Sequence, residues 1–135
     1  MRHILLVEDN PTVRDLTIIL LRRAGYFVRA VRDGQEAWEL LEAGREFDLI
    51  LSDNSMPRMT GLELLRRVRA DQRTAEIPFI LTSGAGAVSQ NDRTPLETVC
   101  KNLSATFVLK PCYELERVVA RVLRNRWVEK PATES

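Results

Sequence analysis

The sequence predicts an α/β fold in which a doubly wound, five-stranded parallel sheet lies between two layers of helices, giving a three-layer sandwich. Apolar runs typical of strands alternate about five times with segments of helical periodicity. These runs are continuous, as in strands that are buried on both faces. No linker or low-complexity segment interrupts the 135 residues. Five right-handed βα units would account for this pattern.

The first strand–helix unit is marked by an apolar run and by residues that start and stop a helix. His3–Val7 is the expected strand. Asn10 and Pro11 then begin a helix, because asparagine is a favoured N-cap and proline is favoured at the first helical position. Gly25 ends this helix as a C-terminal cap. The apolar spacing predicts that the helix packs on the sheet through Val13, Leu16, Leu20 and Leu21.

The second and third units follow the same logic. Tyr26–Val31 is the second strand, and the helix after it begins at Asp33 and ends near Gly44. Leu49–Ser52 is the third strand. The third helix begins with Thr60–Glu63, whose spacing is that of a capping box. The residues that we expect to face the core are Ala37, Leu40 and Leu41 in the second helix and Leu62, Leu65 and Val68 in the third.

The last two units include a longer loop, from Ala85 to Thr94. Phe79–Thr82 is the fourth strand. Thr94–Glu97 again has the capping-box form, with proline at the first helical position, and predicts a fourth helix over Pro95–Leu103. Thr106–Leu109 is the fifth strand, and an apolar stripe predicts a final helix over Tyr113–Arg126.

Composition favours one ordinary globular domain, which we expect over residues 1–127 with a C-terminal tail over residues 128–135. Apolar residues make up 44% of the chain and charged residues 29%. The net charge of +1 provides no long-range field for nucleic acid or an anionic membrane, so neither is an expected partner. No apolar run resembles a signal peptide or a membrane span, and a cytoplasmic location is expected.

The cysteines and the single histidine offer little chemistry. Cys100 and Cys112 lack the spacing of a metal or redox motif and are expected to be reduced structural thiols. His3 lies at the start of the first strand, away from the strand ends where ligands bind, so histidine-based catalysis within this chain is not expected.

Three apolar runs stop abruptly at ionisable residues. Glu8 and Asp9 follow the first strand, Asp53 follows the third and Lys110 follows the fifth. Because the carboxyl ends of parallel strands meet at one edge of the sheet, these side chains should lie close together. Taken singly, Glu8 and Asp9 are also compatible with acids at a helix start, and Lys110 with a solvated lysine.

Together these groups predict phosphate chemistry with a cation. Three carboxylates would repel one another unless a cation lay between them, and Mg²⁺ prefers oxygen ligands. Asp53 is the expected nucleophile, because a carboxylate can attack phosphorus once the charges are neutralised. Lys110 is suited to contact a phosphate oxygen, and its bond to Pro111 is a candidate for the cis form.

Ser83 follows the fourth strand and is the candidate hydroxyl donor to a phosphoryl oxygen. Gly84 after it would allow close approach of a substrate. Thr82, one position earlier, is the alternative donor, and both are also compatible with an ordinary polar strand end.

These motifs in this order resemble the receiver domain of two-component response regulators, the CheY-like superfamily with a flavodoxin-like fold. The resemblance extends from Ile4 to about Arg126. It depends on the segments Glu8–Asp9, Asp53–Gly61, Ser83–Gly84 and Phe107–Pro111.

The resemblance implies a phosphorylation-activated signalling switch rather than a turnover enzyme. Asp53 would accept phosphate from a phosphohistidine on a histidine kinase or a histidine phosphotransfer protein. Mg²⁺ would be held by Glu8, Asp9, Asp53 and the backbone carbonyl of Ser55. Lys110 would contact the phosphoryl group.

The resemblance also implies a switch and an output surface. Ser83 would contact the phosphoryl group and Phe107 would turn inward when Ser83 moves. Output would occur by contact with another protein, and the fourth helix, fifth strand and fifth helix are the candidate surface. The protein would be a monomer or a phosphorylation-dependent dimer. Arg14 and Thr17, on the expected exposed side of the first helix, are candidate contacts for the kinase.

Two other functions are compatible with parts of the pattern. A pseudo-receiver would be an interaction module that does not use phosphate, although such modules usually lose the acids or the lysine that this chain keeps. An aspartyl-phosphate phosphatase of the haloacid dehalogenase type would need an acid two residues after Asp53, where this chain has Ser55.

Overall fold

The computed structural model describes the backbone of residues 2–84, 86–89 and 93–133, and the side chains of these residues up to 125. Five parallel strands form one sheet in the order β2-β1-β3-β4-β5. The strands are β1 (His3–Val7), β2 (Phe27–Val31), β3 (Leu49–Asp53), β4 (Phe79–Ser83) and β5 (Thr106–Leu109). The helices are α1 (Pro11–Arg23), α2 (Gly34–Glu42), α3 (Gly61–Ala70), α4 (Leu96–Asn102) and α5 (Leu115–Thr133).

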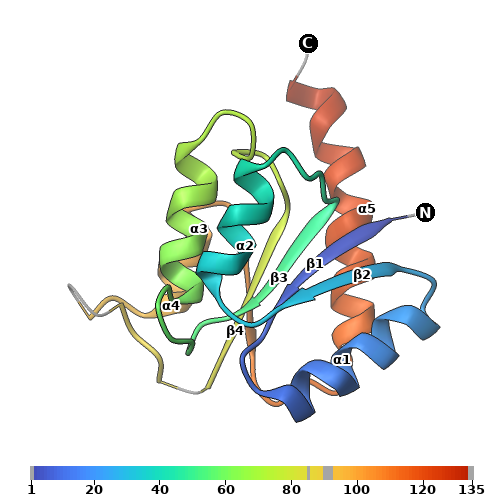
Figure 1. Ribbon diagram of the computed structural model, residues 1–135. Helices are drawn as coiled ribbons and strands as arrows, with labels where there is room; N and C mark the ends of the chain where they lie inside the picture. Colours follow the sequence, from blue (N-terminus) through green and yellow to red (C-terminus); the bar gives the residue numbers. More distant parts are fainter. Residues whose placement is uncertain (1, 85, 90–92, 134–135) are drawn as a thin grey trace.

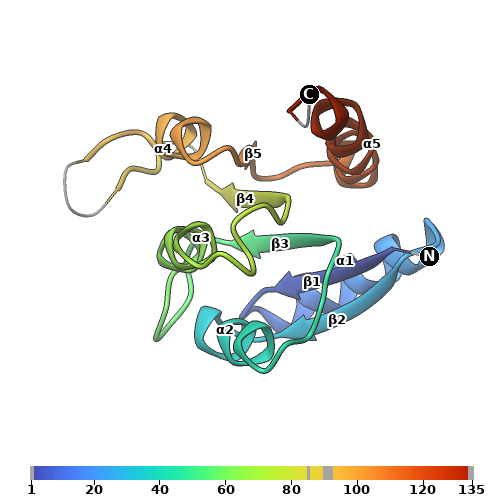
Figure 2. The same cartoon turned by 90° about the horizontal axis from the view of Figure 1, so that it is seen from above.

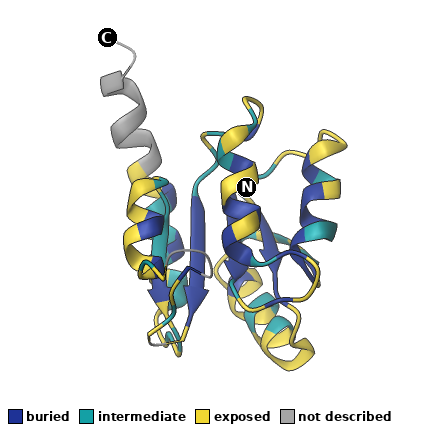
Figure 3. Cartoon of the chain, turned by 90° about the vertical axis from the view of Figure 1, so that its left-hand side faces the viewer, coloured by how far each residue is buried: buried dark blue, intermediate teal, exposed yellow. Residues whose placement is uncertain are grey.

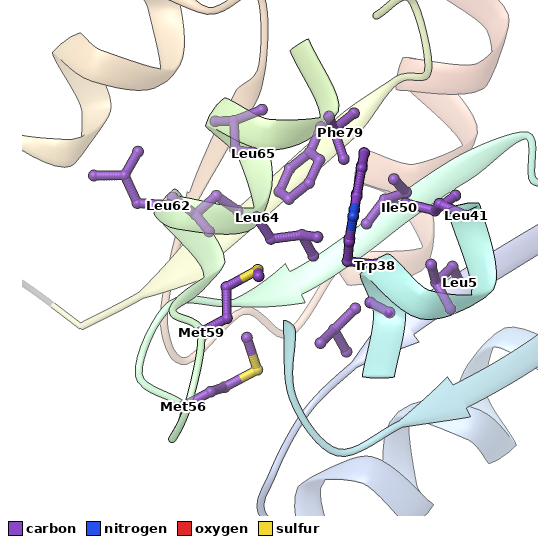
Figure 4. Packing of buried hydrophobic residues seen from close by; sticks show 14 of the residues in the cluster. Leu5, Trp38, Leu41, Ile50, Met56, Met59, Leu62, Leu64, Leu65 and Phe79 are labelled. Carbon is purple, nitrogen blue, oxygen red and sulfur yellow. The ribbon is translucent and has the colours of Figure 1, made fainter. Parts of the chain in front are cut away.

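Helices cover both faces of the sheet, which confirms the predicted doubly wound sandwich. Figures 1 and 2 show α2, α3 and α4 on one face and α1 and α5 on the other. One core cluster lies under α2, α3 and α4 and contains Trp38, Leu65 and Phe79 (Figure 4). The other lies under α1 and α5 and contains Leu21 and Val119. The central strands are therefore buried on both faces (Figure 3), as their continuous apolar runs predict.

The predicted N-caps of the first three helices are confirmed. The side chain of Asn10 accepts hydrogen bonds from the backbone N–H groups of Thr12 and Val13 at 2.9 and 3.1 Å. Asp33 caps α2, and Thr60 forms a complete capping box with Glu63. These side chains satisfy backbone donors that have no partner inside the helix.

The predicted packing face of α1 is wrong. Of the four residues predicted to face the sheet, only Leu21 is buried, and Leu16 is 63% exposed. The more buried side of the helix instead carries Arg14, Thr17, Ile18 and Leu21, a helical spacing of three and four residues.

Two polar side chains can lie on this side of α1 because their hydrogen bonds are satisfied there. The Arg14 guanidinium donates to the backbone carbonyl of Glu8 at 3.0 Å, and the Thr17 hydroxyl donates to the carbonyl of Val13 at 2.8 Å. Apolar residues occur all around this helix, so their spacing alone did not identify the buried side.

Two helix ends also differ from expectation. Pro95, rather than Thr94, is the N-cap of α4, and no side-chain hydrogen bond caps this helix. The backbone N–H of Leu96 is satisfied instead by the carbonyl of Ala87 at 3.1 Å. The last helix begins at Leu115 rather than Tyr113 and continues to Thr133, beyond the predicted end at Arg126, and no glycine or proline in 127–130 interrupts it. Residues 134 and 135 lie outside the described part.

The two cysteines are free, as expected, with Cys100 buried and Cys112 partly buried. Burial raises the pKa of the Cys100 thiol to about 11, which is unsuited to nucleophilic chemistry. No helix in the described part of the chain is long and apolar enough to cross a membrane.

Gly61 is predicted to be the glycine least tolerant of a side chain. A Cβ atom here would clash with the carbonyl oxygen of Asp53 and lie 3.0 Å from the Cα of Asn54, and these backbone atoms cannot rotate away. Gly61→Ala should therefore lower the free energy of unfolding by about 2–3 kcal/mol in urea denaturation, in the upper part of the usual range for overpacking. Gly84→Ala is the matched control, because a Cβ there meets nothing within 4 Å. Equal stability of the two variants would contradict the close approach of α3 to β3.

Candidate functional site

The carboxyl ends of the strands meet at one edge of the sheet, beside the point where the strand order reverses. β1 lies between β2 and β3, and the chain continues from β1 and β3 into helices on opposite faces. Doubly wound sheets bind ligands outside the strand ends at such a point. Glu8 follows β1 and Asp53 ends β3, so these two acids flank it. The strand register places Val7 beside Ser52, Asp53 beside Thr82 and Ser83 beside Leu109.

Three carboxylates converge at this point. Glu8, Asp9 and Asp53 each offer a ligand oxygen, and these oxygens lie within 4.8 Å of one another. Glu8 is only 5% exposed and Asp53 7%, whereas Asp9 is exposed. Closely grouped carboxylate oxygens are donors that Mg²⁺ prefers, so these residues fit that metal.

Lys110 supplies the positive charge beside the acids. Its Nζ lies 2.8 Å from Oδ1 of Asp53 and 3.3 Å from Oε1 of Glu8. Burial alone would lower the pKa of Lys110, but the hydrogen bond and charge of Asp53, and then the charge of Glu8, raise it overall. The ammonium therefore stays charged. The Lys110–Pro111 bond is cis, as anticipated.

Glu8 is fixed by hydrogen bonds but remains electrostatically unfavourable as an anion. Its carboxylate accepts from the backbone N–H of Asn10 at 3.3 Å and from Lys110. The pKa of Glu8 is nevertheless raised, first by burial and then by the nearby charge of Asp53. Lys110 and the Asn10 N–H oppose this shift without cancelling it.

The other predicted site residues lie around this group. Ser83 is buried at the end of β4, and its carbonyl accepts from the backbone N–H of Lys110 at 2.8 Å. Thr82, the alternative hydroxyl donor, has its Oγ1 at 3.5 Å from the carbonyl of Ser52. Phe107 is partly buried and packs against the cluster under α2, α3 and α4. Ser55 is exposed in the loop after β3.

Two features of the loop between β3 and α3 were not anticipated from the sequence. The side chain of Asn54 accepts from the backbone N–H of Leu62 at 3.0 Å, so the residue after Asp53 closes the loop onto α3. Arg58 forms an ion pair with Asp33 at the start of α2. The presence of an arginine in this loop is the only sequence signal for the ion pair. It does not identify Asp33, 25 residues earlier, as the partner.

Comparisons with known proteins agree with this arrangement. The family model for the response regulator receiver domain matches residues 4–122. The two-component response regulator ORR5 of Oryza sativa subsp. japonica is 35% identical over 124 residues, covering 90% of this chain and 89% of that protein. The signal receiver domain of a signal transduction histidine kinase from Syntrophus aciditrophicus is 32% identical with a TM-score of 0.77, covering 93% of this chain and 92% of that one.

A second solved structure includes a metal. It is the receiver domain of the sensor histidine kinase PA1611 from Pseudomonas aeruginosa PAO1, with a magnesium ion coordinated in its active site cleft. That domain is 32% identical to this chain, with a TM-score of 0.73, and the match covers 90% of this chain and 97% of that one.

Glu8→Gln is predicted to stabilise the metal-free protein in a pH-dependent way. A raised pKa means that the folded state binds the Glu8 proton more tightly than the unfolded state, so ionisation of Glu8 disfavours folding. The advantage of the variant should be absent well below the ordinary value of 4.5, grow as the pH rises through the raised pKa, and then level off.

Urea denaturation in EDTA across about pH 4 to 8 would measure this difference. The exposed acid Glu76 provides a control, since Glu76→Gln changes the net charge equally without touching the cluster. An advantage of Glu8→Gln that is constant with pH, or that shrinks as the pH rises, would contradict the assigned electrostatics.

Proposed function

Because the chain belongs to the response regulator receiver domain family, we propose that it is a phosphorylation-activated signalling switch whose phosphoacceptor is Asp53. Receiver domains of two-component systems are signalling switches that interact with histidine kinases. The donor proposed here is a phosphohistidine on a histidine kinase or a histidine phosphotransfer protein. The observation that carries the proposal is the position of Asp53 within a group of three carboxylates, with the Lys110 ammonium 2.8 Å away.

The proposed reaction is a transfer between two side chains. An Asp53 carboxylate oxygen attacks the phosphorus of the phosphohistidine, an O–P bond forms and the P–N bond breaks. The leaving imidazole keeps its bonding electrons and takes up a proton from solvent. Asp53 thereby becomes an acyl phosphate, and the protein is a phosphoacceptor rather than a turnover enzyme.

Charge neutralisation is the main requirement of this step. Mg²⁺, held by Glu8, Asp9, Asp53 and the backbone carbonyl of Ser55, would neutralise negative charge on the carboxylates and on the transferred phosphoryl group. The Lys110 ammonium already contacts Asp53 and would move to a phosphoryl oxygen as charge develops there.

The conformational response belongs to the same proposal. Ser83 would donate its hydroxyl to a phosphoryl oxygen, and Phe107 would turn further inward as Ser83 moves. The half-buried position of Phe107 leaves room for such a change. Output would then pass through α4, β5 and α5 by contact with another protein or a second copy. The cytoplasmic location expected from the sequence remains a prediction.

The surface proposed for the phosphohistidine donor is the outer side of α1. Arg14 and Thr17, the residues first assigned to this contact, use their side chains within the domain. Four large apolar residues of α1 are exposed instead, and the helix begins directly after the acid cluster. They are Val13, Leu16, Ile19 and Leu20. An apolar patch beside the phosphoacceptor suits a helix that carries the histidine.

Intact mass after incubation with acetyl phosphate tests the phosphoacceptor. The wild-type protein should gain one phosphoryl group in the presence of Mg²⁺ and none in EDTA. Asp53→Asn should gain none, because an amide oxygen cannot take the place of the carboxylate nucleophile. Asp15→Asn removes an exposed acid outside the cluster and should behave as wild type.

Each alternative result has a definite meaning. No gain by the wild-type protein under any condition would favour the pseudo-receiver. Robust labelling of Asp53→Asn would show that another residue is the nucleophile.

Leu16→Glu tests the α1 surface. This variant should take phosphate from acetyl phosphate at the wild-type rate. Its phosphorylation by an autophosphorylated histidine kinase that labels the wild-type protein should slow about tenfold or more, because a charge replaces an apolar contact. Phe27→Glu is the matched control, since Phe27 is also about half exposed but lies at the opposite end of the sheet. Equal transfer to both variants would exclude α1 as the docking surface.

A further inference from the structure

The loop from Asn54 to Thr60 is held at both of its ends. One hydrogen bond joins the two ends of the loop: the carbonyl of Asn54 accepts from the backbone N–H of Gly61 at 3.1 Å. Within the loop, Met56 and Met59 are buried, and Figure 4 shows both side chains pointing into the core cluster. Ser55, whose carbonyl is a proposed metal ligand, therefore lies on a short segment with little freedom.

Arg58 occupies the most constrained position of this loop. Its φ of +64° lies in the left-handed region, which a long side chain adopts rarely and at a steric cost. Its Nε and Nη2 both donate to Oδ2 of Asp33, at 2.8 and 2.6 Å. Paired donation from a guanidinium to a carboxylate is stronger and more directional than a single contact, so it can offset the backbone strain.

Asp33 is well placed to act as an anchor. It is 5% exposed, and its other oxygen, Oδ1, accepts from the backbone N–H of Glu36 at 2.9 Å as the N-cap of α2. Burial would raise the pKa of Asp33, but the Glu36 N–H and the Arg58 guanidinium outweigh burial and lower it. Both oxygens of one ionised, buried carboxylate are therefore engaged, one by a helix and one by the loop.

The same two segments also pack directly on each other. The backbone N–H of Gly34 donates to the carbonyl of Met59 at 3.3 Å. A Cβ on Gly34 would lie 2.8 Å from that carbonyl oxygen, so the segments are as close as backbone allows. The ion pair and this contact fix the loop against α2 from two sides.

We infer that Arg58 is a positioning residue for the metal site. Through its ion pair with Asp33, it holds the β3–α3 loop so that the Ser55 carbonyl stays in place to bind Mg²⁺. Arg58 does not itself contact the acid cluster in the described structure. This inference rests on the proposed function, because it assumes that the cluster binds Mg²⁺ with the help of that carbonyl.

The charge of Arg58 makes the inference unusually easy to test. Removing a positive charge should by itself strengthen the binding of a divalent cation. Loss of loop positioning should weaken it. The two effects have opposite signs, so the direction of the change identifies which one dominates.

The experiment is a Mg²⁺ titration by isothermal titration calorimetry, with fold stability checked by urea denaturation. Arg58→Gly is the main variant, because glycine tolerates the left-handed conformation and removes the ion pair without adding strain. We expect its Mg²⁺ dissociation constant to rise about tenfold, as is usual when a residue that orients a metal ligand is removed.

Arg32→Ala is the matched control. Arg32 is an exposed arginine paired with Glu36 at 2.8 Å, so this variant removes a positive charge from the same region while the hydrogen bonds from Arg58 to Asp33 stay in place. Its Mg²⁺ affinity should equal or slightly exceed that of the wild-type protein.

A double-mutant cycle tests whether Arg58 acts through Asp33. Asp33→Asn removes the charge that pairs with Arg58 but keeps a side-chain oxygen that can cap α2. It should therefore weaken Mg²⁺ binding in the wild-type background and have little further effect in Arg58→Gly. Additive effects would overturn the inference, as would Arg58→Gly binding Mg²⁺ as tightly as wild type or more tightly. If the wild-type protein itself bound no Mg²⁺, the proposed function would fail instead.

Discussion

Repulsion among three carboxylates is the constraint around which the carboxyl edge of this sheet is organised. Glu8 and Asp53 are almost fully buried, and Asp9 lies within 4.8 Å of both. Burial and then the charge of Asp53 raise the pKa of Glu8, while Asp53 and Glu8 raise the pKa of Lys110 against the effect of burial. One ammonium reduces the negative charge of the cluster without removing it. The folded protein thus keeps an excess of negative charge that suits a divalent cation.

The sheet determines where these charges lie. Asp53 is the last residue of β3, and the hydrogen bond from Lys110 N–H to the Ser83 carbonyl continues the β4–β5 ladder up to the lysine. The central strands are buried on both faces by two separate core clusters, which leaves them little freedom to shift. The electrostatic arrangement therefore depends on ordinary packing on either side of the sheet.

The strands, the starts of the first three helices and the acid–lysine group could be predicted from the sequence because each has a local signal. An apolar run that stops at Asp53, or an asparagine followed by proline, is sufficient to identify a strand end or a helix start. The buried side of α1 could not be predicted this way, because apolar residues surround that helix and Arg14 finds its hydrogen bond only in the folded state. The ion pair between Arg58 and Asp33 joins segments that are far apart in sequence, so no local pattern identifies it.

The left-handed backbone at Arg58 has a consequence for how this loop can vary among related proteins. A side chain other than glycine at position 58 depends on the acid at position 33 to compensate its backbone conformation, whereas a glycine does not. The two positions should therefore covary. Relatives with glycine at position 58 are free to lose the acid at 33, and a lineage that gains a long side chain at 58 should gain or retain the acid first.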